Sequence, residues 1–172
     1  MFIELIATIF AGIAAAGLMM LVNFATARRL PRWLTPVAAG LGMIAATVSN
    51  EYTWYDRTAD ALPDGMTVAV TVTEQSWVRP WTQAWPYTER FIAVDTGNAR
   101  RNDNIPGQVL TDIYFFGRWS PVSKAPMLFD CTGQRSALLI DGAAFAEDGS
   151  ISDADWQPLP PGDPLLGTAC ET

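Results

Sequence analysis

Residues 3–24 read IELIATIFAGIAAAGLMMLVNF, and this stretch decides how the chain is organised. Glu4 is its one charged residue, and large apolar side chains recur through the rest of it. A helix of this length spans about 33 Å, which is enough to cross the hydrocarbon core of a bilayer. A secretory signal peptide would open with a positively charged segment, whereas this chain opens with MFIE. We therefore expect a retained transmembrane helix.

A second apolar segment, residues 34–52, follows a short connector and consists mainly of small residues. Thr35 and Pro36 fit an N-cap followed by a proline in the first helical turn. Trp33 and Tyr52 would then lie at the two headgroup layers. A buried helix of a soluble protein is the alternative, because Ala-rich segments are weaker spans. The favoured interpretation is an N-terminal two-helix transmembrane hairpin.

The connector between the two segments carries Arg28, Arg29 and Arg32. Short loops rich in arginine stay on the cytoplasmic side of a membrane. Both the N-terminus and everything after the second helix are then expected on the opposite side. The predicted location is the inner membrane of a bacterium, with the C-terminal domain in the periplasm.

Small residues recur every four positions along one face of each segment. Such faces let helix backbones approach closely inside a membrane. They serve either the packing of the two helices on each other or docking against other membrane subunits, and the sequence leaves both open. The residues are Ala7, Ala11 and Ala15 in the first segment and Ala38, Gly42 and Ala46 in the second.

The composition changes near residue 50, which divides the chain into a hairpin, residues 1–56, and a domain, residues 57–172. Alternating apolar residues and turn signals predict strands in the domain. Without helical crossovers between the strands, the sheet is expected to be mostly antiparallel. The predicted class is an α+β membrane protein with a β-rich extracytoplasmic domain. Strands are expected at 66–73, 90–96, 110–119, 127–131 and 136–140, with one helical turn at 165–169.

Cys131 and Cys170 are the only cysteines, and both lie in the predicted exported domain. On the oxidising side of a membrane such a pair normally forms a disulfide. Two buried free thiols are the alternative. The expected bridge would tie the C-terminal segment to the sheet.

The run FIAVDTG, residues 91–97, resembles the catalytic loop of aspartic proteases in its Asp-Thr-Gly ending. There the aspartate shares a proton with a symmetry mate and activates water. The resemblance covers only these residues and implies a homodimer with Asp95 as the catalytic group. A strand running into a turn, with Asp and Gly as turn formers, explains the same residues and is favoured.

Other catalytic or metal-binding chemistry has little support in the sequence. The chain has no histidine, which excludes Ser-His-Asp and Cys-His arrangements. Ser120 and Ser123 flank the single lysine, Lys124, but their spacing matches no strong pattern. The acids in residues 148–155 lack EF-hand spacing and fit a hairpin turn. We expect no cofactor, no metal and no enzymatic activity.

Residues 77–87 read WVRPWTQAWPY and form an unusually aromatic connection after the first predicted strand. Trp77, Arg79, Trp81 and Trp85 are residue types of interface hot spots and of membrane-surface belts. A small domain also needs large side chains for its core. The sequence therefore leaves open whether these rings pack in the core or contact a partner or lipid headgroups.

From Glu51 onward acids outnumber bases by about two to one, which argues against nucleic acid as a partner. The expected function is that of a non-enzymatic accessory, structural or assembly subunit of an inner-membrane complex. Its partners would be the lipid bilayer and other membrane subunits. An electron-transfer complex is one candidate host, since an acidic surface steers basic carrier proteins. The alternatives are a membrane-tethered hydrolase using Asp95 and a periplasmic ligand-binding domain using the Trp-rich connection.

Overall fold

The computed structural model describes residues 2–102, 105, 107–139 and 154–171. The chain divides into two compact units, Met1–Trp54 and Tyr55–Thr172.

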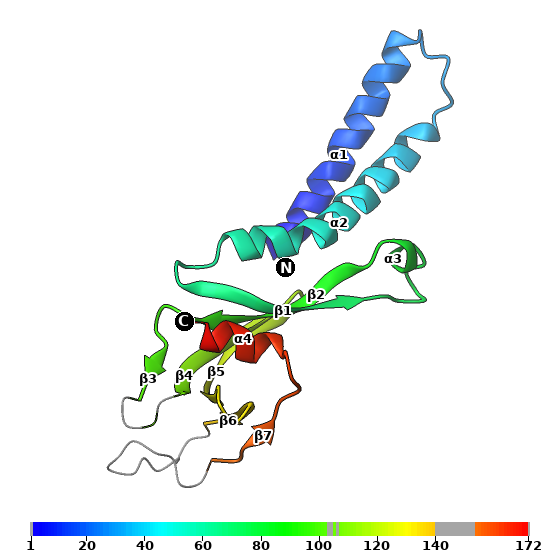
Figure 1. Cartoon of the computed structure of the whole chain (residues 1–172). Coiled ribbons are helices and arrows are strands. Elements are labelled where there is room, and N and C mark those ends of the chain that lie inside the picture. Colours follow the sequence, from blue (N-terminus) through cyan, green and yellow to red (C-terminus); the bar gives the residue numbers. More distant parts are fainter. Residues whose placement is uncertain (1, 103–104, 106, 140–153, 172) are drawn as a thin grey trace. The chain divides into compact units, whose positions relative to one another are not determined.

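The first unit is a pair of helices, α1 (Phe2–Ala25) and most of α2 (Leu34–Asp60), joined by the arginine connector (Figure 1). Asn23 shapes the turn: its carbonyl oxygen accepts from the Arg28 amide at 2.7 Å, and its side chain accepts from the Leu30 amide at 3.2 Å. Ala27 and Arg28 adopt positive φ angles of 56° and 59° there. The connector thereby reverses the chain within a few residues.

The small-residue faces of α1 and α2 contact each other. A Cβ atom built on Gly42 would lie 2.6 Å from the Cβ of Ala15 and 3.1 Å from the carbonyl oxygen of Ala11. A Cβ atom built on Gly12 would likewise lie 2.7 Å from Cγ of Met43. Part of the predicted small-residue face is therefore occupied by the packing of the hairpin itself, whereas Ala7 is exposed.

The outward surfaces of both helices are apolar. They expose large side chains over most of the length of α1 and over the first half of α2. Among the described residues, one helix, Ile3–Ala25, is long and apolar enough to cross a membrane, which is compatible with an anchor or a signal sequence. The second expected span does not reach this standard, because polar residues enter its helix from Ser49 onward. The exposed residues include Ile9, Phe10, Ile13, Leu18 and Leu21 of α1 and Val37, Leu41 and Ile44 of α2.

The close helix contact predicts opposite effects of one substitution at two nearby glycines. Gly42→Ala should destabilise the hairpin by about 1–3 kcal/mol, because the added methyl group overlaps Ala15. Gly40→Ala should instead stabilise it by up to about 1 kcal/mol, because nothing lies within 4 Å of the new Cβ and alanine favours helix. Thermal unfolding in detergent micelles, followed by far-ultraviolet circular dichroism, measures both. A stabilising Gly42→Ala would contradict this packing.

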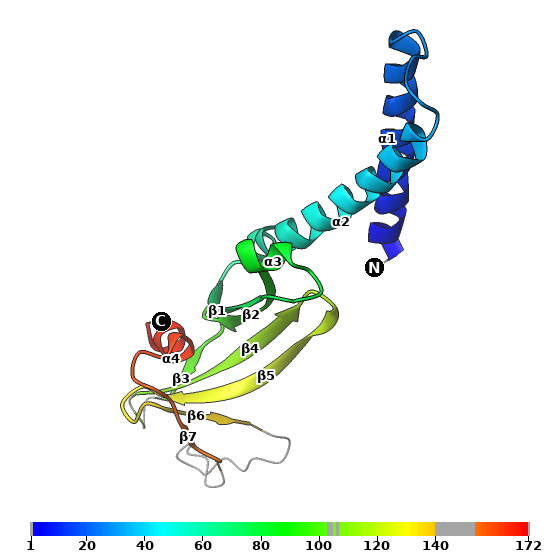
Figure 2. The same ribbon diagram turned by 90° about the vertical axis from the view of Figure 1, so that its right-hand side faces the viewer.

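The second unit is a curved antiparallel sheet with α4 on one face (Figures 1 and 2). The strand order is β1-β2-β4-β5-β6-β7, and the short β3 also pairs with β4. The predicted α+β class with a mostly antiparallel sheet is confirmed. The elements are β1 (Met66–Glu74), α3 (Trp81–Ala84), β2 (Tyr87–Asp95), β3 (Arg100–Arg101), β4 (Gln108–Gly117), β5 (Ser120–Asp130), β6 (Arg135–Leu138), β7 (Gln157–Pro158) and α4 (Pro164–Cys170).

The core lies between the sheet and α4. Val94, Ile113 and Phe129 come from neighbouring strands β2, β4 and β5, and Leu166 and Ala169 of α4 cover them. Their burial follows from strand alternation, which puts every second side chain on the same face. Packing in this core therefore depends on α4 being held against the sheet.

The other face of the sheet carries a stack of aromatic rings. Phe91 of β2 is parallel to Phe116 of β4, with ring centroids 4.6 Å apart. Tyr55, from the last turns of α2, forms a T-shaped pair with Phe91, with ring centroids 5.4 Å apart. The chain therefore enters the second unit against Phe91.

Candidate functional site

The two ends of the sheet differ in character, and the strand register identifies them. Glu74 at the end of β1 pairs with Tyr87 at the start of β2, while Gly117 at the end of β4 pairs with both Arg90 and Ser120. The β1–β2 connection, residues 75–86, and the β4–β5 turn, residues 118–119, consequently lie at the same end (Figure 2). We call this the aromatic end.

Exposed hydrophobic side chains concentrate at the aromatic end. Trp77 is 89% exposed and Trp85 is 69% exposed, so neither packs in the core. Nine large hydrophobic side chains are exposed in the described part of the second unit, and only Leu138 lies away from this end. A soluble domain rarely gathers its exposed apolar residues in one place without an occupant for them. The eight are Val72, Trp77, Val78, Trp81, Trp85, Phe115, Trp119 and Val122.

The connection that presents these tryptophans is held by the fully buried Thr82. Its hydroxyl accepts from the Ser76 amide at 2.9 Å and lies 2.7 Å from the Arg79 carbonyl oxygen, to which it donates. The Trp85 amide closes the single turn of α3 on the carbonyl of Trp81. The exposed rings are thus carried on a hydrogen-bonded scaffold.

Charged groups surround the base of this connection. The Arg79 guanidinium lies 5.9 Å from the centre of the Tyr87 ring. Burial raises the pKa of Glu89 above its ordinary value, as do a hydrogen bond with Glu74 and the charge of that carboxylate; Arg90 and Arg79 oppose the rise. Glu74 and Glu89 therefore lie side by side at the base of the connection, with Arg79 and Arg90 near Glu89.

The β4–β5 turn adds a second aromatic tip. The Arg118 guanidinium lies 4.8 Å from the centre of the half-exposed Trp119 ring, a cation–π contact. The Arg118 amide donates to the Glu89 carbonyl at 3.0 Å, which ties this turn to β2. Two connections that are distant in sequence thus form one surface.

At the opposite end, Asp95 serves a turn. Both of its carboxylate oxygens accept from the Asn98 side chain, at 3.1 and 2.9 Å, and one also accepts from the Asn98 amide. Thr96 donates its hydroxyl to the Gly65 carbonyl, and Gly97 donates its amide to the same oxygen. Asp95 therefore closes its own turn with Asn98, while Thr96 and Gly97 tie that turn to the residue before β1.

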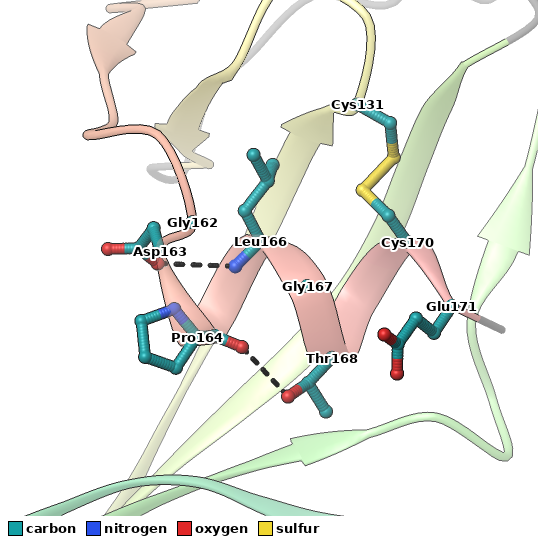
Figure 3. Close-up of a pocket in the computed structure, with 9 residues that line it drawn as sticks. All are labelled: Cys131, Gly162, Asp163, Pro164, Leu166, Gly167, Thr168, Cys170 and Glu171. Atoms are coloured by element: carbon teal, nitrogen blue, oxygen red, sulfur yellow. Dashed lines mark hydrogen bonds between the residues drawn. A yellow bond between two sulfur atoms is a disulfide. The ribbon is translucent and has the colours of Figure 1, made fainter.

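The two cysteines form a disulfide, with Cα atoms 5.9 Å apart. It lines an open pocket of about 440 Å³ together with residues of α4 (Figure 3). Two polar side chains on this lining stabilise α4 itself: the Asp163 carboxylate caps its N-terminus, and the Thr168 hydroxyl donates to the Pro164 carbonyl. The pocket therefore follows from the docking of α4.

Asp130 organises the turn next to the disulfide. Its carboxylate accepts from the Gly133 amide at 2.8 Å and from Arg135 at 2.8 Å, and Arg135 stacks on Trp156. Burial alone would raise the pKa of Asp130, but the bonds from Gly133 and Arg135 outweigh it, and the pKa is lowered. The folded state thus favours the ionised carboxylate.

Asp130→Asn should lower the free energy of unfolding by about 1–2 kcal/mol at neutral pH, because it removes a charge-assisted bond. A depressed folded-state pKa stabilises above the unfolded value and loses this effect as pH falls through the folded value. The difference from wild type should therefore shrink below about pH 4. Urea denaturation across pH measures it, with Asp112→Asn, which removes the surface ion pair with Lys124, as a control of little effect. A difference that persists in acid would contradict this account.

Lys124 forms an ion pair with Asp112. Its Nζ donates to Asp112 at 3.0 Å, and this bond raises the pKa of the lysine. Ser123 precedes it in β5 and so points to the other face of the sheet. The acidic segment 148–155 lies mostly outside the described residues. Among the residues that the structure describes, no group of three potential metal ligands occurs.

No family model, curated protein or solved structure matches the chain.

Sequence reasoning singled out Trp77, Arg79, Trp81 and Trp85 but left them between core and surface. The structure places all three tryptophans outside the core, so core packing is wrong for them. The joining of this connection with Trp119 could not be foreseen, because it depends on the β2–β4 register. The sequence interpretation had placed Trp119 at the end of a strand, 110–119, and expected no turn there.

Proposed function

We propose that the chain is a non-catalytic accessory subunit of an inner-membrane complex, with α1 and α2 as its anchor and the β domain in the periplasm. The observation that carries this proposal is the division of the hairpin into two faces. Small residues, among them Gly42 and Ala15, pack between the helices, and large apolar side chains cover the outside of both. Such an outer surface requires lipid or other membrane subunits around it.

The polar groups of the hairpin support a span by both helices. Glu4 of α1 accepts from the Asn50 side chain of α2 at 3.0 Å, so the two helices become polar at the same level. From Leu34 to Asn50, α2 rises about 24 Å, which covers most of a bilayer core. Arg28, Arg29 and Arg32 are exposed at the other end and favour the cytoplasmic side. The disulfide agrees with an oxidising compartment for the domain.

The side chains in the domain that could take part in catalysis are engaged in structural contacts, which supports a binding role over a catalytic one. Asp95 closes a turn with Asn98, Lys124 is paired with Asp112, and the cysteines are joined. The acidic remainder of the domain would attract a basic partner protein. A basic electron carrier of an electron-transfer complex is one such partner. Association with such a partner should weaken as salt concentration rises.

Purification of the full chain through a C-terminal tag in a mild detergent, followed by mass spectrometry, tests the proposal. We expect stoichiometric membrane subunits to accompany the chain. Phe10→Ala, on the outer face of α1, should reduce their recovery, whereas W77F/W85F should leave it unchanged. Recovery of a lone monomer, from membranes in which the chain is present at its native level, would overturn the proposal.

A further inference from the structure

The aromatic end has the residue chemistry of a bilayer interface. Tryptophan is enriched at the headgroup level of membranes, because its ring is apolar and its indole N–H is polar. Trp77 and Trp85 on one connection and Trp119 on the next provide three such rings at one end of the sheet. Val78 and Val122 add exposed aliphatic side chains beside them. This mixture suits the boundary between headgroups and acyl chains.

The charge at this end differs from that of the rest of the domain. The aromatic end has more basic than acidic side chains, whereas acids outnumber bases by two to one over residues 55–172. The bases are Arg79, Arg90 and Arg118, and the acids are Glu74 and Glu89. Basic side chains close to a bilayer are attracted by anionic lipids, and the acidic remainder is repelled. This charge distribution therefore favours an orientation with the aromatic end toward the lipid.

Two features favour contact with a bilayer: the place where the chain enters the second unit, and the hydrogen bonds that hold the β1–β2 connection in one conformation. Tyr55, the first residue of the second unit, packs on Phe91, which is next to Arg90 at the base of the aromatic end. A covalent tether gives a weak contact a high effective concentration at the membrane. The scaffold around Thr82 also spares the entropy of ordering the tryptophans on contact.

We propose that the aromatic end docks on the anionic headgroup layer of the bilayer that holds α1. This inference rests on the anchoring part of the proposed function. It adds a second membrane contact, which would fix the orientation of the β domain and leave its acidic surface directed away from the lipid.

Quenching by brominated lipids tests the docking. The purified full chain is reconstituted into vesicles of phosphatidylcholine and phosphatidylglycerol, in which the phosphatidylcholine is either ordinary or brominated near the headgroup. We expect bromolipid to quench Trp77 and Trp85, so that W77F/W85F shows a clear loss of quenching. W156F is the matched control at the opposite end of the sheet and should not reduce quenching, and W33F reports on the anchor. Circular dichroism should show the same fold for all variants.

The outcomes separate the two proposals. If W33F reduces quenching and W77F/W85F does not, the chain is anchored but the docking proposal fails. If no variant changes the quenching, the anchoring fails as well. Two results would overturn the requirement for anionic lipid. One is that Trp77 and Trp85 are quenched as strongly in vesicles of phosphatidylcholine alone as in vesicles with phosphatidylglycerol. The other is that high salt does not reduce their quenching. Protection of these tryptophans from acrylamide only in the co-purified complex would identify a protein as the occupant and reject lipid.

Discussion

Phe129→Ala is expected to lower the free energy of unfolding of the β domain by about 3–5 kcal/mol. The side chain is fully buried, in the same core cluster as Ile113 of the neighbouring strand and Leu166 of α4. Its removal leaves a cavity that the surrounding strands fill only in part, so the lost contacts and the cavity both contribute. Urea denaturation of the full chain in detergent micelles, followed by near-ultraviolet circular dichroism, measures the loss.

Trp77→Ala is the matched control, because it removes an aromatic side chain of at least equal size from the same domain. Trp77 is 89% exposed, so the free energy of unfolding should change by no more than about 0.5 kcal/mol. The pair therefore separates core aromatics from those of the aromatic end. Equal losses for the two variants would mean that the Trp-rich connection belongs to the core after all.

Local sequence patterns predicted the elements whose interactions are local. The apolar run of α1 and the alternating valines of β1 needed no knowledge of tertiary contacts. The helical turn expected at 165–169 is the centre of α4, where Asp163 and Pro164 begin the helix. The pairing of the two cysteines followed from their being the only ones.

The first half of β5 was missed because Pro121 and Pro126 argue against a strand. In the structure, β6 pairs only with residues 127–130 of β5, so the described part of β5 before Met127 has β4 on one side and no ladder on the other. Proline is tolerated on such an edge because no amide is needed there. The aromatic end could not be predicted for a related reason. Whether the side chains at the tip of a hairpin are exposed depends on the register of the strands and on which other parts of the protein cover the tip.

The second helix shows where composition alone reaches its limit. Its apolar part is short, and Ser49, Asn50 and Glu51 enter the same helix. The pairing of Asn50 with Glu4 gives these polar residues a place at one level of the hairpin. Whether a marginal segment crosses a bilayer thus depends on its partner helix as much as on its own hydropathy.

Loss of the Cys131–Cys170 disulfide is expected to lower the free energy of unfolding by about 4 kcal/mol in the chain-entropy model. The bond joins residues 39 apart and connects the end of β5 to the end of α4. Because α4 covers Val94 and Phe129, releasing its last turn also loosens the cover of the core. Cys131→Ala and Cys170→Ala should each show this loss.

The double variant decides whether the bond or the side chains are responsible. If the cross-link dominates, C131A/C170A loses about as much as either single variant, because the same bond is removed once in all three. A reductant should then bring the wild-type chain to the stability of the double variant and leave the double variant unchanged. Losses that add between the two sites, together with a wild type insensitive to reductant, would mean that burial of the sulfur atoms and not the cross-link stabilises the domain.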